Sequence, residues 1–61
     1  MPMSGKQMLE LFIADGWKRL RRRGSHVVVG KGALRETIPM HKELKKGLES
    51  ALLKRLSKRQ P

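Results

Sequence analysis

The sequence contains no cysteine and no tyrosine, and it has only one tryptophan and one phenylalanine among its 61 residues. Without cysteine, disulfides and thiolate metal sites are excluded, which fits a reducing compartment. No apolar run approaches the roughly 20 residues that cross a bilayer, and the N-terminus lacks the basic-then-apolar order of a signal peptide. We therefore expect a cytoplasmic protein with no membrane segment.

Acidic residues are also scarce, because five Asp and Glu stand against fifteen Lys and Arg, for a formal net charge of +10. A surplus of this size attracts polyanions, and nucleic acid is the most common partner of that kind. The same charge could serve only to keep a small domain soluble. A membrane surface is disfavoured because neither expected helix combines basic flanks with a bulky aromatic face.

Two amphipathic segments are expected to form helices. Ser4 followed by Gln7 is typical of a capping box, and Asp15-Gly16 ends the first helix. The expected core face of that helix consists of Met8, Leu9, Phe12 and Ile13. The second helix is expected from about residue 46 to residue 57, and its expected core stripe is Leu48, Ala51, Leu52 and Leu56, with Leu44 entering from the preceding loop.

The residues between the helices predict three antiparallel strands, at 17–23, 25–29 and 33–38. The charged residues of the first strand are typical of an edge strand. Gly30-Lys31-Gly32 predicts a hairpin turn between the second and third strands. Pro39 is expected to end the third strand. Residues 40–45 form a connection. The expected fold is α+β, of order α-β-β-β-α, with both helices on one face of the sheet. One domain spans residues 1–61, with residues 1–3 and 58–61 as frayed ends.

His26 is the main candidate for chemistry. Side chains alternate along a strand, so if Val27 and Val29 face the core, His26 stands on the open face of the sheet. Arg35 and Thr37 are expected there as well. A histidine side chain can transfer protons near neutral pH, including on a phosphodiester. The alternative is an inert surface histidine.

Other residues are candidates for supporting roles. Ser25 either orients the imidazole of His26 or caps the turn, and the turn role is favoured. His41 either acts as the complementary acid or is a solvated loop histidine, which is favoured. The sequence offers no carboxylate pair at metal-binding spacing and no nucleotide-binding loop, so no metal or cofactor is expected. Basic residues expected to bind RNA are Lys18, Arg19, Arg21, Arg22, Arg23, Lys31 and Arg35.

Several motifs of this sequence, in their order along the chain, resemble those of the HicA toxins of bacterial toxin-antitoxin systems. The resemblance rests on Asp15-Gly16-Trp17, the Gly24-Ser25-His26 step, the segment from Thr37 to His41, and a closing helix with Gly47-Leu48 and residues 52–56. It implies a fold like that of double-stranded RNA-binding domains, cleavage of mRNA that blocks translation, and neutralisation by a HicB antitoxin. The catalytic histidine of the family corresponds to His26. Many members have a second histidine and an aromatic residue where Val27 and Val29 stand here.

Three classes of function are compared. The first is a ribonuclease toxin, whose acidic antitoxin would cover His26 and the basic sheet face. The second is a non-catalytic RNA-binding module, and the third is a structural basic protein such as a ribosomal component. Composition alone favours the second class, and the resemblance favours the first. Leu34, Val28 and Trp17 are candidate apolar anchors for the partner if they are exposed. The cleaved RNA sequence, ribosome dependence and stoichiometry are not indicated.

Overall fold

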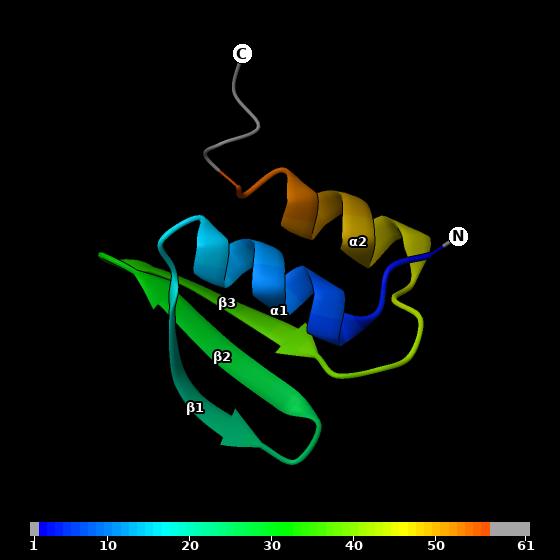
Figure 1. Cartoon of the computed structure of the whole chain (residues 1–61), viewed down its shortest axis with the longest axis horizontal. Coiled ribbons are helices and arrows are strands. Elements are labelled where there is room, and N and C mark those ends of the chain that lie inside the picture. Colours follow the sequence, from blue (N-terminus) through cyan, green and yellow to red (C-terminus); the bar gives the residue numbers. More distant parts are fainter. Residues whose placement is uncertain (1, 57–61) are drawn as a thin grey trace.

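The computed structural model describes residues 2–56 and confirms the expected order of elements. The elements are α1 (Gly5–Ala14), β1 (Lys18–Arg23), β2 (His26–Lys31), β3 (Leu34–Pro39) and α2 (Lys46–Leu53). Figure 1 shows the three strands and the two helices along the chain. Expectations for Met1 and residues 57–61 lie outside the described residues.

The three strands form one antiparallel sheet in the order β1-β2-β3. His26 is the register partner of both Arg23 on β1 and Pro39 on β3. An irregularity between Arg19 and Arg21 shifts the register of β1, and Leu20 lies at this bulge. Because directly paired residues point to the same face, these pairs fix which side chains share the face of His26.

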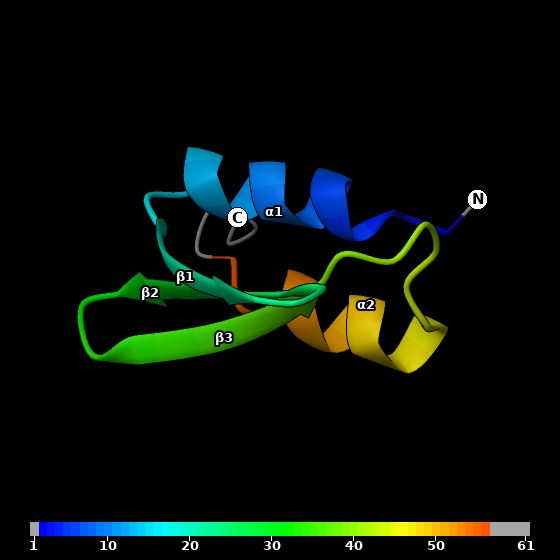
Figure 2. The same cartoon turned by 90° about the horizontal axis from the view of Figure 1, so that it is seen from below.

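The core lies on one face of the sheet, and both helices contribute to it. Val27, Val29 and Ile38 of the strands are fully buried, together with Met8 and Phe12 of α1. Leu44, Leu52 and Leu56 belong to the same cluster. Figure 2 shows α1 as a layer on one side of the sheet, so the opposite face is left uncovered by α1. The expected two-layer α+β fold, similar to that of double-stranded RNA-binding domains, is confirmed.

The sequence patterns that predicted the two ends of α1 are confirmed. Ser4 and Gln7 form the expected capping box, in which each side chain accepts a hydrogen bond from the other residue's backbone N–H. Gly16 follows the helix with a φ of 100°, in the left-handed region that favours glycine. The turn glycines Gly24 and Gly32 both have a φ of 59°.

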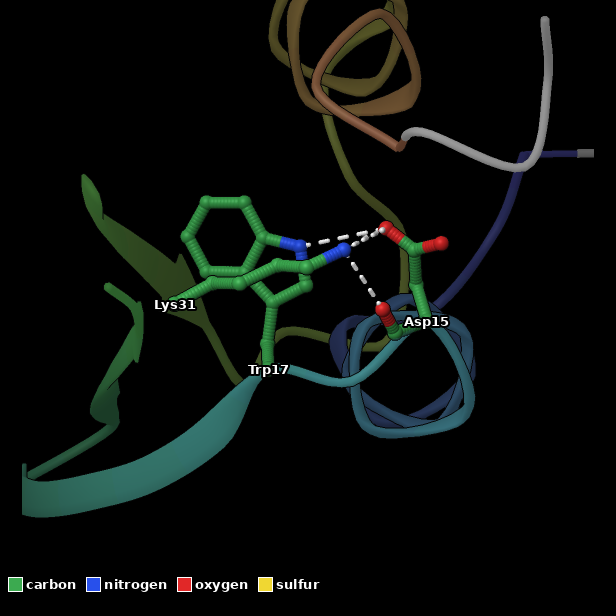
Figure 3. A network of polar contacts seen from close by, with 3 residues as sticks. All are labelled: Asp15, Trp17 and Lys31. Carbon is green, nitrogen blue, oxygen red and sulfur yellow. Dashed lines mark hydrogen bonds and ion pairs between the residues drawn. The ribbon is translucent and has the colours of Figure 1, made fainter. Parts of the chain in front are cut away.

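A buried polar network joins the end of α1 to β2. Trp17 Nε1 donates to Asp15 Oδ2 at 3.3 Å, and Lys31 Nζ donates to the Asp15 carbonyl oxygen at 2.8 Å. The same ammonium forms an ion pair with Asp15 Oδ2 at 3.5 Å. Figure 3 shows both donors converging on Asp15. This network fixes the start of β1 against the far end of β2.

Several sequence expectations were wrong in detail. Ile13 is 46% exposed and Leu48 36% exposed, and Ala51 is exposed too. The buried face of each helix is therefore narrower than its apolar face. Gly30 and Lys31 belong to β2, and the hairpin turn lies at residues 32–33 because Gly32 has the left-handed conformation. Trp17 precedes β1 and is buried. Among residues 2–56, no helix has both the length and the apolarity needed to cross a membrane.

Candidate active site

His26 begins β2 and is exposed, whereas the next residue, Val27, is fully buried. The alternation therefore places the imidazole on the sheet face opposite the core. This confirms the expected position of His26 on the open face. Its register partners, Arg23 and Pro39, share that face.

His41 lies next to His26 although fifteen positions separate them in the sequence. The centroids of the two rings are 6.3 Å apart, and their planes form an angle of 71°. Both residues are exposed. The sequence favoured a solvated loop histidine over a complementary acid; the structure shows that His41 is exposed and that the imidazole of His26 lies beside it.

Backbone hydrogen bonds hold the loop of His41 in place. Met40 N donates to the Ser25 carbonyl oxygen at 2.6 Å, next to His26. Gly5 N at the start of α1 donates to the His41 carbonyl oxygen at 2.9 Å. The loop after β3 is thus fixed both to the β1–β2 turn and to α1. Ser25 contributes to this position through its backbone, and an orienting role for its hydroxyl stays a prediction.

The seven basic residues expected to bind RNA divide into three groups. Four of them share the face of His26, since their register partners are Gly30, Val28 and His26. They are Lys18, Arg21, Arg23 and Arg35. Arg19 and Arg22 pair with the buried residues Val29 and Val27, so they lie on the helix side of the edge strand β1. Lys31 is engaged by Asp15.

The open face also has a depression next to the basic residues. Its lining includes Arg21 and Arg35 as well as Leu20, Val28 and Thr37. Arg35 is held there, because Nη1 donates to the carbonyl oxygens of Gly32 and Leu34 at 2.8 and 2.7 Å. A polyanion lying in this depression would meet the guanidinium groups of Arg21 and Arg35.

The candidate apolar anchors have different environments. Trp17 is only 2% exposed, so it belongs to the core and not to a partner surface. Val28 is half-buried on the open face, and Leu34 is 45% exposed beside the β2–β3 turn. Within the described part of the chain, no three His, Cys, Asp or Glu side chains gather as a metal site would require.

Comparison with models of protein families gave a match. A family model described as the HicA toxin of bacterial toxin-antitoxin systems matches residues 5–57. The matched range includes both imidazoles, all strands and both helices. Neither the curated proteins nor the solved structures contain a match to this chain.

Proposed function

Because the chain belongs to the HicA toxin family of bacterial toxin-antitoxin systems, we propose that this toxin is a ribonuclease that cleaves mRNA in the cytoplasm and so blocks translation. The observation that supports this activity best is the pair of exposed imidazoles, 6.3 Å apart, beside the basic open face. A non-catalytic RNA-binding module would need the cations, but it would not need two adjacent imidazoles.

The proposed reaction uses the 2′-hydroxyl of the ribose as the nucleophile. A neutral imidazole accepts the 2′-hydroxyl proton while the O2′–P bond forms, and a protonated imidazole donates a proton to the departing 5′-oxygen as the P–O5′ bond breaks. The products are a 2′,3′-cyclic phosphate and a 5′-hydroxyl end. His26 and His41 share these two roles. The chemistry is complete without a metal or cofactor.

The basic residues of the open face supply the electrostatic part of the mechanism. Arg23 is the register partner of His26, and Arg21 and Arg35 line the neighbouring depression. Guanidinium groups bind phosphate with two parallel hydrogen bonds and stabilise the charge that develops on the phosphorane oxygens. Lys18 extends this surface toward the start of β1.

The partner of such a toxin is an antitoxin, which in this family is a HicB protein. We propose that it is acidic and covers both imidazoles together with the basic residues of the open face. Opposite charge would speed the association, because the toxin carries a formal net charge of +10.

Cleavage of a defined RNA in EDTA tests the proposal. We expect wild-type protein to leave cyclic phosphate ends, and His26→Ala and His41→Ala each to lower the rate by about 10²- to 10⁴-fold, the usual contribution of a positioned acid or base. Lys42→Ala is the matched control, because this exposed neighbour of His41 lies in the same loop. A 2′-deoxy substitution at the cleaved position should abolish cleavage.

The pH dependence separates a chemical role of His41 from a structural one. With one imidazole neutral and the other protonated, the wild-type rate should fall on both sides of an optimum, and His41→Ala should flatten one side only. Intact RNA after incubation with a folded wild-type protein that still binds it would favour the RNA-binding module instead. Full growth arrest by His26→Ala would contradict the mechanism.

A further inference from the structure

A second concave surface lies between α1 and β1, on the helix side of the sheet. We call it the α1–β1 groove, and its volume is about 660 Å³. Its apolar lining consists of Leu9, Ile13, Ala14 and Met40. Ile13 is 46% exposed, although it is a large aliphatic residue on the same helix as the core residues Met8 and Phe12. An aliphatic surface of this kind gains free energy when a partner covers it.

The edges of the α1–β1 groove are basic. Lys6 lies on α1, while Arg19 and Arg22 come from β1, and Glu10 is the one acidic residue that also lines the groove. Three cations against one carboxylate favour an acidic occupant. The register of β1 explains why these arginines are here, since both pair with buried valines and so point away from the face of His26.

The groove reaches the residues that support the imidazoles. Arg22 Nε donates to the Gly24 carbonyl oxygen at 2.8 Å, in the turn that precedes His26. Met40 lines the groove, and its backbone N–H is bonded to Ser25 at 2.6 Å. A segment bound in the groove would therefore contact two residues, Arg22 and Met40, that are hydrogen-bonded to the turn before His26.

We propose that the α1–β1 groove binds an acidic, amphipathic segment of the antitoxin. Apolar side chains of that segment pack against Ile13 and Met40, and its carboxylates pair with Lys6, Arg19 and Arg22. RNA fits the groove less well, because the lining has no aromatic ring on which a base could stack. The proposal rests on the proposed function in one respect, namely that the acidic partner is the antitoxin.

Ile13→Glu tests the groove, and Leu11→Glu is its matched control. Leu11 is on the same helix, is 40% exposed and does not line the groove. The probe is the purified protein encoded by the reading frame adjacent to the toxin's own. Calorimetry should show that Ile13→Glu weakens binding by at least about tenfold, as expected for a central apolar contact, whereas Leu11→Glu binds like wild type. Circular dichroism checks that both variants are folded.

The RNA cleavage assay distinguishes the groove from the active site. Ile13→Glu should cleave RNA at the wild-type rate and arrest growth even when the antitoxin is co-expressed. Wild-type affinity of Ile13→Glu for the antitoxin would overturn the proposal, as would weaker RNA binding with unchanged antitoxin affinity. A toxin dimer that Ile13→Glu dissociates would show that a second copy occupies the groove instead. If the antitoxin binds as proposed and RNA stays intact, the ribonuclease proposal fails while the groove proposal stands.

Discussion

Gly5 connects the start of α1 to the loop that carries His41. A Cβ atom at this position would lie 1.9 Å from the Pro39 carbonyl oxygen and 2.8 Å from the Met40 Cα, and both are backbone atoms that cannot rotate away. The same close approach allows Gly5 N to donate to the His41 carbonyl oxygen. Gly5 therefore places the second imidazole by lacking a side chain.

We predict that Gly5→Ala destabilises the fold and lowers the cleavage rate, because α1 and the 39–41 loop must separate. Forcing a methyl group into a close contact costs about 1–3 kcal/mol in the free energy of unfolding. Gly47→Ala is the matched control, since a Cβ at Gly47 in α2 meets nothing within 4 Å. There alanine should stabilise the helix by up to about 1 kcal/mol. Urea unfolding and RNA cleavage measure the two effects, and equal behaviour of both variants would contradict the role given to Gly5.

The elements that the sequence predicted well are those whose signals are local. The capping box needs only Ser4 and Gln7, and the burial of Val27 and Val29 follows from strand alternation. Ile13 and Leu48 were misplaced because helical periodicity shows that a face is apolar but not how much of it another element covers.

For a related reason, the sequence predicted the position of His26 in the candidate site but not the position of His41 beside it. The open-face position of His26 follows from its own strand. The neighbourhood of His41 depends on the pairing of Pro39 with His26 and on the bond from Gly5, which are contacts between distant segments. The sequence placed Lys31 in a turn and among the RNA-binding residues, but β2 continues through Lys31 and brings its ammonium to Asp15.

Asp15 should matter for stability more than for RNA binding. In Asp15→Ala the buried indole N–H of Trp17 loses its acceptor, which costs about 1–3 kcal/mol in the free energy of unfolding. Lys31→Met should also destabilise the fold, because it takes the ammonium away from an Asp15 side chain that is only 3% exposed, although water partly screens the 37% exposed Lys31 side chain. Thermal unfolding ranks the two variants. RNA affinity measured on Lys31→Met should stay near the wild-type value, and a large loss would restore Lys31 to the RNA interface.

Seven of the fifteen Lys and Arg residues lie on two different surfaces of the molecule. Lys18, Arg21, Arg23 and Arg35 lie on the face of the imidazoles, whereas Lys6, Arg19 and Arg22 border the α1–β1 groove. Just after α2, Arg55 forms an ion pair with Glu36 of β3. At physiological ionic strength, salt screens interactions between exposed charges beyond about 8 Å. A bound ligand therefore interacts mainly with the charged residues near it, and not with the net charge of +10 as a whole.

The salt dependence of RNA affinity can show whether RNA binds to the cations of the open face or is attracted by all the cations of the protein. In a His26→Ala background that leaves the RNA intact, we predict that Arg21→Gln makes the slope of log affinity against log salt shallower by about 0.7, the value for one phosphate contact on a single strand. Lys54→Gln removes the same charge from an exposed position at the end of α2 and should leave the slope unchanged. Fluorescence anisotropy over a salt series gives both slopes. Equal changes of slope in the two variants would mean that RNA affinity depends on the total charge of the protein. The proposed RNA-binding role of the open face would then be wrong.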